Sequence, residues 1–131
     1  MDALVMLVAI AGVGLYGWTG FRVGRGRYKY GVHAPAMTGS PEFERLVRVQ
    51  MNTLEWLPMF LVGLWAFAVT VEPRIAAAIG AVWILGRFLY ATSYARDPAK
   101  RAPGFLIQAA ACAILLLGGG IGAGLRLLNG G

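Results

Sequence analysis

The sequence is poor in charge, in cysteine and in histidine. Only 14% of its 131 residues are charged, against about 25% in soluble domains. The single cysteine, Cys112, cannot form an intrachain disulfide, and its place inside an apolar run favours a small buried or lipid-facing residue over a nucleophile. The single histidine, His33, has no cysteine, histidine or carboxylate partner at ligand spacing, so we expect no metal site.

Apolar residues make up most of the chain, at 58%, compared with about 45–50% in soluble proteins. A helix needs about 20 residues to cross a bilayer, and three of four apolar runs reach that length alone. The second run reaches it only if its helix extends back through the polar residues before it. We therefore predict an all-α membrane protein with four transmembrane helices in one domain, residues 1–131, and read the first run as a retained helix rather than a signal peptide. The four runs are Ala3–Phe21, Leu57–Val71, Ile75–Tyr94 and Phe105–Leu128.

The net charge of +6 is concentrated in two of the connections. By the positive-inside rule, the first and third loops face the cytoplasm and both termini face the opposite side. Lipid headgroups are expected partners for part of this charge, whereas nucleic acid is not expected to bind such short loops. The basic residues of these two regions are Arg22, Arg25, Arg27, Lys29, Arg45 and Arg48, and then Arg96, Lys100 and Arg101.

The connections carry recognisable turn signals. The stretch GRGRYKYGVHAPAMTGSP is predicted to be an ordered but irregular loop, and Ser40 at its end is predicted to cap the second helix. Residues 71–74 are predicted to form a tight turn, so that the second and third helices are antiparallel neighbours. Asp97-Pro98 is predicted to turn the chain and begin a fresh helical turn, which holds Arg101 at the membrane surface.

A polar constellation is predicted at the loop end of the second and third helices. At about 100° per residue, the polar residues of the second helix fall within a stripe of roughly 80°, while Gln50 points to the opposite face, toward lipid in a monomer or toward a neighbour in an oligomer. Three residues of the third helix share one face near the same end, and Arg101 follows them. The set comprises Arg45, Arg48, Asn52 and Glu55, and Arg87, Tyr90 and Tyr94.

This inventory of side chains favours one kind of ligand. Several arginines imply an anion, because guanidinium groups pair with carboxylates in a bidentate way. The lone carboxylate Glu55, with Asn52 beside it, implies that the ligand also carries an ammonium group. A small zwitterion with more than one carboxylate satisfies both. The alternative interpretation is a buried ion-pair network, with Arg48–Glu55 at its centre, that ties helices together.

Two segments resemble a known family. MTGSPEFERLVRVQMNTLEWLPMFL is similar to the signature of the MAPEG family, membrane-associated proteins of eicosanoid and glutathione metabolism, nearest its leukotriene-C synthase and second microsomal glutathione transferase branch. GRFLYATSYARDPAKRAPGF resembles that family's third helix and following loop. The resemblance implies a homotrimer of left-handed four-helix bundles, with glutathione at each subunit interface near the cytoplasmic side.

The resemblance also assigns roles to particular residues. It implies that glutathione is held by Arg48, Asn52, Glu55, Tyr90 and Tyr94, that Arg27 and Gln50 reach it from the neighbouring subunit, that Arg87 lines the site, and that Arg101 stabilises the thiolate. Two positions depart from the family pattern. Trp56 stands where the family has a tyrosine, and Tyr28 stands where the leukotriene-forming enzyme has an arginine. These departures bear on the lipid substrate rather than on glutathione.

The expected activity is therefore a glutathione-dependent membrane transferase, with glutathione as co-substrate and no metal, that conjugates the thiolate to hydrophobic electrophiles or lipids. Peroxidase activity toward lipid hydroperoxides is compatible with the same chemistry. The alternative is a non-catalytic lipid-binding or scaffold protein of the same fold. A small transporter is disfavoured because the chain has no inverted repeat. Compact loops without sorting signals favour a bacterial inner membrane.

Overall fold

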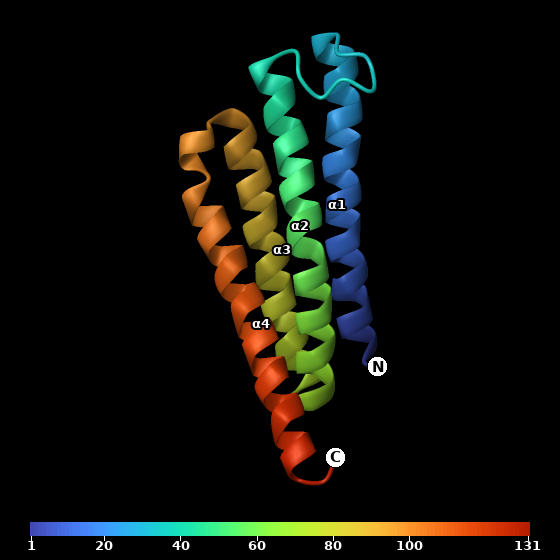
Figure 1. The fold of residues 1–131 in the computed structure, drawn as a ribbon, viewed down its shortest axis with the longest axis vertical. Helices are drawn as coiled ribbons and strands as arrows, with labels where there is room; N and C mark the ends of the chain where they lie inside the picture. The colour runs from blue at the N-terminus through green and yellow to red at the C-terminus, as the bar shows by residue number, and fades with distance from the viewer.

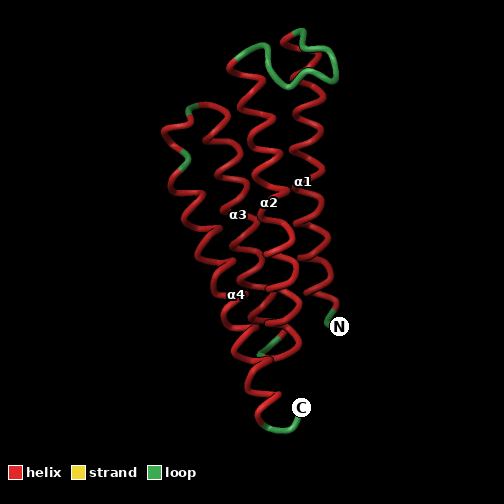
Figure 2. The backbone as a smooth tube through the Cα atoms, in the orientation of Figure 1, coloured by secondary structure: helices red, strands yellow, loops and turns green.

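A computed structural model describes residues 1–131, and its secondary structure elements are all helices (Figure 1). All four α-helices are long and apolar enough to cross a membrane, which confirms the prediction of four long apolar helices. Short connections join them, as the tube in Figure 2 shows. The elements are α1 (Ala3–Tyr30), α2 (Pro41–Thr70), α3 (Pro73–Arg96), the 3-10 turn η1 (Pro98–Lys100) and α4 (Ala102–Leu128).

The α2–α3 pair lies between the other two helices. α1 contacts α2 and α3, and α4 contacts the same two helices (Figure 1). The first and third connections lie at one end of the bundle, and both chain termini lie toward the other end (Figure 2). The polar stripe of α2 and the polar face of α3 are therefore at the end that carries the basic connections.

The first connection is shorter than the sequence predicted. α1 continues past Phe21 to Tyr30, so residues 24–30 of the expected loop are helical. Gly31 ends the helix in the left-handed conformation, with φ 68° and ψ 32°, which glycine adopts at little cost. Gly26 is a packing residue, because a Cβ there would lie 2.7 Å from Cδ1 of Leu46 on α2. Two of the glycines that indicate a loop thus serve helix packing and helix termination.

The predicted cap at Ser40 and the predicted helical turn at Asp97-Pro98 are confirmed. Ser40 caps α2 by accepting a hydrogen bond from the backbone N–H of Phe43 at 3.1 Å. α2 is one continuous helix that includes Pro58, so its polar stripe does extend the second apolar run. Asp97 caps η1 by accepting a hydrogen bond from the N–H of Ala99 at 3.0 Å. That short turn places Arg101 at the start of α4.

Aromatic packing forms the centre of the bundle, while its outer surface is apolar. Trp83 of α3 stacks on Phe60 of α2 with ring centroids 3.9 Å apart, and neither side chain is exposed. On the outside, Leu7, Leu85 and Leu117 are 63–67% exposed. Such a surface would be costly in water, so these side chains are suited to contact with lipid.

Two glycines bring α3 and α4 together beside the polar end. A Cβ on Gly104 would lie 2.8 Å from Cα of Tyr90 and 2.9 Å from the carbonyl oxygen of Gly86. These are backbone atoms, so they cannot move aside as a flexible side chain can. The close approach sets the position of Tyr90 relative to the start of α4.

Replacing Gly104 with alanine is therefore expected to destabilise the bundle by about 1–3 kcal/mol, the usual cost of overpacking. Gly124→Ala, in the same helix, is the matched control because a Cβ there meets nothing within 4 Å and alanine favours the helix. Melting temperatures in detergent should fall for the first variant and hold or rise for the second. Equal melting temperatures would contradict the packing role of Gly104.

Candidate functional site

A groove of about 780 Å³ opens at the loop end of the bundle, between α2, α3, η1 and α4. Its volume lies within the range of about 300–1,000 Å³ that is usual for small-molecule sites. Five of the residues predicted from sequence line it, although they come from three separate segments of the chain. The lining residues are Arg48, Asn52, Tyr90, Tyr94, Ala99, Arg101, Ala102, Phe105 and Leu106.

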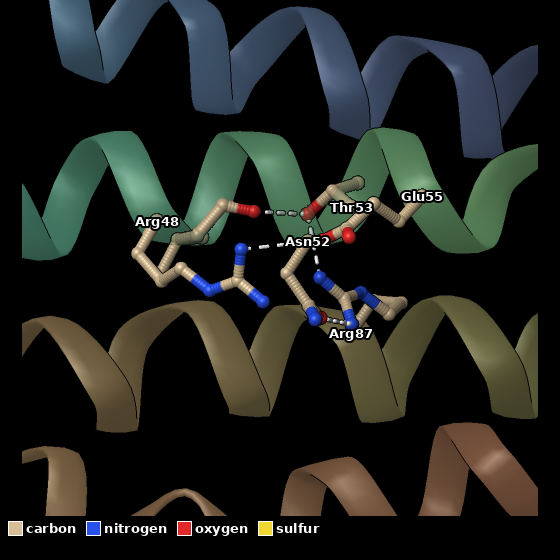
Figure 3. A network of polar contacts seen from close by, with 6 residues as sticks. Arg48, Asn52, Thr53, Glu55 and Arg87 are labelled. Atoms are coloured by element: carbon tan, nitrogen blue, oxygen red, sulfur yellow. Dashed lines mark hydrogen bonds and ion pairs between the residues drawn. The ribbon is translucent and has the colours of Figure 1, made fainter. Parts of the chain in front are cut away.

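Arg48 and Glu55 form an ion pair along α2, beside this groove. Nη1 of Arg48 lies 3.4 Å from Oε1 of Glu55, and the two side chains are 51% and 57% exposed. Both residues belong to one helix (Figure 3), so the pair does not tie helices together, contrary to the alternative interpretation of the sequence. An ion pair this exposed contributes at most about 1 kcal/mol to stability. Both charged groups are therefore available to a ligand.

Arg87 does connect two helices, and it lies beneath the groove rather than in its wall. The residue is fully buried. From α3 its Nη1 donates to Oδ1 of Asn52 at 2.7 Å, and its Nη2 donates to Oγ1 of Thr53 at 2.6 Å (Figure 3). Its guanidinium also lies 4.5 Å from the centroid of the Tyr90 ring. The sequence predicts that Arg87 lines the site. In the structure Arg87 instead supports Asn52 and Tyr90, which do line the groove.

The contact with Arg87 also fixes how Asn52 is presented. A guanidinium group can only donate, so the atom of Asn52 that faces it must be the amide oxygen. The amide NH₂ group is then left to serve the groove, where it can donate to a carboxylate. The sequence pairs Asn52 with Glu55 as a site for an ammonium group. In the structure Arg87 already takes one acceptor position of the Asn52 oxygen, and Glu55 supplies the negative charge.

Aromatic rings form the other wall of the groove. Tyr90 and Tyr94 stack with centroids 5.5 Å apart, and Phe105 of α4 lies 6.2 Å from Tyr90. Trp56 meets Phe105 edge to face at 5.6 Å. Charged groups and aromatic rings therefore line the same groove, which suits a ligand with both polar and apolar parts.

Arg101 stands at the rim of the groove, exposed at the start of α4. Its Nη1 donates to the carbonyl oxygen of Pro98 at 3.0 Å. It has no carboxylate partner, because the chain's one ion pair joins Arg48 to Glu55. Arg101 is thus the groove arginine whose guanidinium has no side-chain partner.

Gln50 and Arg27 lie away from this groove, on the side of α2 that faces α1. A Cβ on Gly20 of α1 would lie 3.2 Å from Nε2 of Gln50, so the amide rests against α1 rather than against lipid. Nη1 of Arg27 donates to the carbonyl oxygen of Ala36 at 2.6 Å, and its guanidinium lies 5.1 Å from the Phe43 ring centroid. Within one chain the structure does not bring these two residues to the groove, so their role toward a neighbour stays a prediction.

Two buried polar residues, Thr53 and Gln108, were not predicted from the sequence. Thr53 accepts from Arg87 and donates to the carbonyl oxygen of Val49 at 2.7 Å. Gln108 of α4 is fully buried and donates from Nε2 to the carbonyl oxygen of Phe105 at 3.2 Å. A lone amide inside an apolar run was the available signal for Gln108, whereas nothing in the sequence distinguishes Thr53 from other helical threonines.

Several known proteins are similar in sequence to this chain over most of its length. A family model described as the MAPEG family matches residues 5–121. Microsomal glutathione S-transferase 2 of Homo sapiens is 38% identical over 119 residues, which cover 91% of this chain and 81% of that protein. Leukotriene C4 synthase of Cavia porcellus is 37% identical over 114 residues, covering 87% and 76%. An uncharacterized protein of Synechocystis is 54% identical over 96 residues, covering 73% and 70%. These matches confirm the resemblance seen in the sequence, and the chain belongs to the MAPEG family.

Proposed function

We propose that this protein is a glutathione-dependent membrane transferase that joins the glutathione thiolate to hydrophobic electrophiles. Relatives named as a glutathione S-transferase and a leukotriene C4 synthase support a glutathione-related membrane enzyme. The observation that carries the proposal is the convergence of five residues on one groove: Arg48, Asn52, Tyr90, Tyr94 and Arg101. A scaffold that only binds lipid has no need for this combination at the edge of an apolar bundle.

The groove, together with Glu55 beside it, offers a complementary group for each charged part of the tripeptide. Arg48 and the amide NH₂ of Asn52 can donate to carboxylates, and Glu55 can pair with the ammonium group. Because Glu55 already pairs with Arg48 at 3.4 Å, a zwitterion would extend an existing line of alternating charge. The tyrosine rings would pack against the middle of the ligand, with Arg101 at the rim.

The chemistry is activation of the glutathione thiol. A free thiol has a pKa near 8.5 and is mostly protonated at neutral pH, whereas an adjacent guanidinium group favours the thiolate. The thiolate sulfur attacks the electrophilic carbon, a carbon–sulfur bond forms, and the leaving group departs with its electron pair. An electrophile concentrated in the membrane thereby meets a water-soluble nucleophile held in position. Peroxidase activity toward lipid hydroperoxides would use the same thiolate.

Two measurements on the detergent-solubilised protein test this function. Calorimetry should show binding of both glutathione and S-methylglutathione, since both carry the charged groups that the groove recognises. Conjugation of an aromatic halide should proceed with glutathione alone. A protein that binds neither tripeptide yet retains a fluorescent fatty acid would instead be the lipid-binding scaffold.

We also propose that the assembly is a homotrimer in which Arg27 and Gln50 reach the groove of a neighbour. Gln50 lies on the side of α2 that faces α1, and Arg27 lies on α1, so neither residue reaches the groove of its own chain. Light scattering in mild detergent, corrected for bound detergent, is expected to give three chains per particle. Gln50→Ala should weaken glutathione binding without changing that mass. A stable monomer with full glutathione affinity would contradict the shared site.

The orientation in the membrane is a further part of the proposal. The first and third connections, with the basic residues around them, would face the cytoplasm, and both termini the opposite side. A bacterial inner membrane is the proposed location of this multi-pass protein. Residues 1–131 would act as one domain, because each of the four long helices packs on the α2–α3 pair or belongs to it.

A further inference from the structure

A second groove lies at the same end of the bundle, on the α1 side of the α2–α3 pair. It has a volume of about 1070 Å³ and lies between α1, the start of α2 and the end of α3. It shares no lining residue with the groove of the proposed transferase site. Its charged lining residues are Arg22, Arg25, Lys29 and Arg96, with Glu42 as the only acid.

The positive charges of this second groove are not neutralised within the chain. Arg22, Arg25 and Lys29 are spaced three and four residues apart, so they share one face of α1, where like charges repel. The one ion pair of the chain is Arg48–Glu55, so none of these cations has a carboxylate within ion-pairing distance. A bound anion would relieve this repulsion.

Arg22 is held in place at the groove by neighbouring groups. Its Nη1 lies 3.4 Å from the carbonyl oxygen of Ala91 on α3, and its guanidinium lies 4.8 Å from the Trp18 ring centroid. Trp18 in turn stacks on Phe88 of α3 at 5.2 Å. The guanidinium is therefore positioned before any ligand arrives, which lowers the entropic cost of binding.

The groove also spans the change from apolar to polar surface along α1. Phe21 lines it and is 63% exposed, and Leu46 adds a second apolar contact. Nearer the loop, Tyr28 is 95% exposed beside the basic residues. Tyrosine and basic residues at this depth are typical of the membrane interface. An amphipathic anion fits this gradient, with its charged group against the cations and its chains toward Phe21.

We propose that this second groove binds the phosphate of an anionic phospholipid from the leaflet on the loop side of the membrane. Arginine and lysine are the usual partners of phosphate oxygens, and juxtamembrane basic clusters attract anionic lipids. The three cations of α1 are turned by about 140–160° from Arg27 around that helix. The groove therefore stays open to lipid when the Arg27 face meets a neighbouring subunit. This site does not depend on the glutathione chemistry.

Native mass spectrometry of the delipidated protein in detergent tests the proposal, with phosphatidylglycerol and phosphatidylcholine of identical acyl chains as probes. Phosphatidylglycerol should bind at least tenfold more tightly. In the variant Arg25→Gln/Lys29→Gln its affinity should fall by about thirtyfold, from the usual contribution of two basic residues near anionic lipid. The control variant Arg74→Gln/Lys100→Gln removes the same charge outside both grooves and should bind like the parent.

Equal affinity for the two lipids would overturn the proposal, and so would equal losses in the groove variant and the control. Soluble glycerol phosphate should not displace the lipid; if it does so at lipid-like concentration, the groove is a site for free phosphate. Melting temperature and glutathione binding should be unchanged in both variants. Should Arg25→Gln/Lys29→Gln fail to fold, Arg96→Gln on α3 tests the same groove, with an expected loss of about fivefold.

Discussion

Replacing Glu55 with glutamine is expected to lower glutathione affinity by about 1.5–3 kcal/mol, the range for a hydrogen bond to a charged group. Glutamine keeps the shape of the side chain and removes the negative charge that would meet the ligand's ammonium group. Fold stability should change little, because the Arg48–Glu55 pair lies within one helix and both side chains are more than half exposed. Calorimetry of glutathione binding measures the loss, and light scattering follows the assembly.

Two controls make the Glu55 result specific. Glu44→Gln removes an exposed acid from the first turn of the same helix, outside both grooves, and should leave affinity unchanged. A glutathione analogue that lacks the α-amino group should bind the parent and the Glu55→Gln variant equally, which closes a double-mutant cycle on the one contact. If the assembly dissociates while glutathione affinity in the surviving fraction is unchanged, Glu55 is structural rather than ligand-binding.

Much of the fold follows from local signals. Apolar length predicts the four spans, and the caps at Ser40 and Asp97 involve residues only two or three positions apart. The end of α1 could not be predicted in this way. Gly26 looks like a loop residue until Leu46 of α2 is placed against it. Gly26 is needed for a tertiary contact with α2, and no pattern within its own segment predicts that contact.

The candidate site, like the fold, can be predicted from local patterns only in part. Helical periodicity predicts that Arg48 and Asn52 share one face and that Tyr90 and Tyr94 share another, and the structure brings both faces to one groove. The same periodicity groups Arg87 with the tyrosines, yet Arg87 does not line the groove. Depth in the bundle depends on what stands opposite, and a threonine hydroxyl stands there. The orientation of the Asn52 amide depends on its own hydrogen bond with Arg87, a tertiary contact that the sequence does not predict.

The three arginines at the groove have different partners, and Arg101 is the one best suited to the chemical step. Arg48 pairs with Glu55, and Arg87 donates to Asn52 and Thr53. Arg101 donates only to the carbonyl oxygen of Pro98, and it lines the same groove from the α4 side. A guanidinium group with no acidic partner keeps its full field for an anion that forms during catalysis. We therefore expect Arg101 to stabilise the thiolate more than the thiol.

Arg101→Ala is then expected to raise the pKa of bound glutathione toward its free value and to slow conjugation. Losing about 1.4–2.8 kcal/mol of differential stabilisation corresponds to roughly ten- to hundredfold in rate. Because less thiolate is present at neutral pH, the rate profile should shift to higher pH, and the gap to the parent should narrow as the solution pH passes the raised pKa. Ultraviolet absorbance of the thiolate across a pH series, with glutathione bound to each variant, measures the shift directly.

Affinity for S-methylglutathione should change much less in this variant, since that ligand forms no thiolate and an interaction made mainly with the anion contributes little to ground-state binding. Lys100→Ala is the matched control, because it removes a neighbouring exposed cation that does not line the groove. A bound thiol that titrates as in the parent, with conjugation unimpaired, would remove Arg101 from the mechanism. The groove would then contain no arginine free to stabilise a thiolate, and a lipid-binding scaffold would account better for this member of the family.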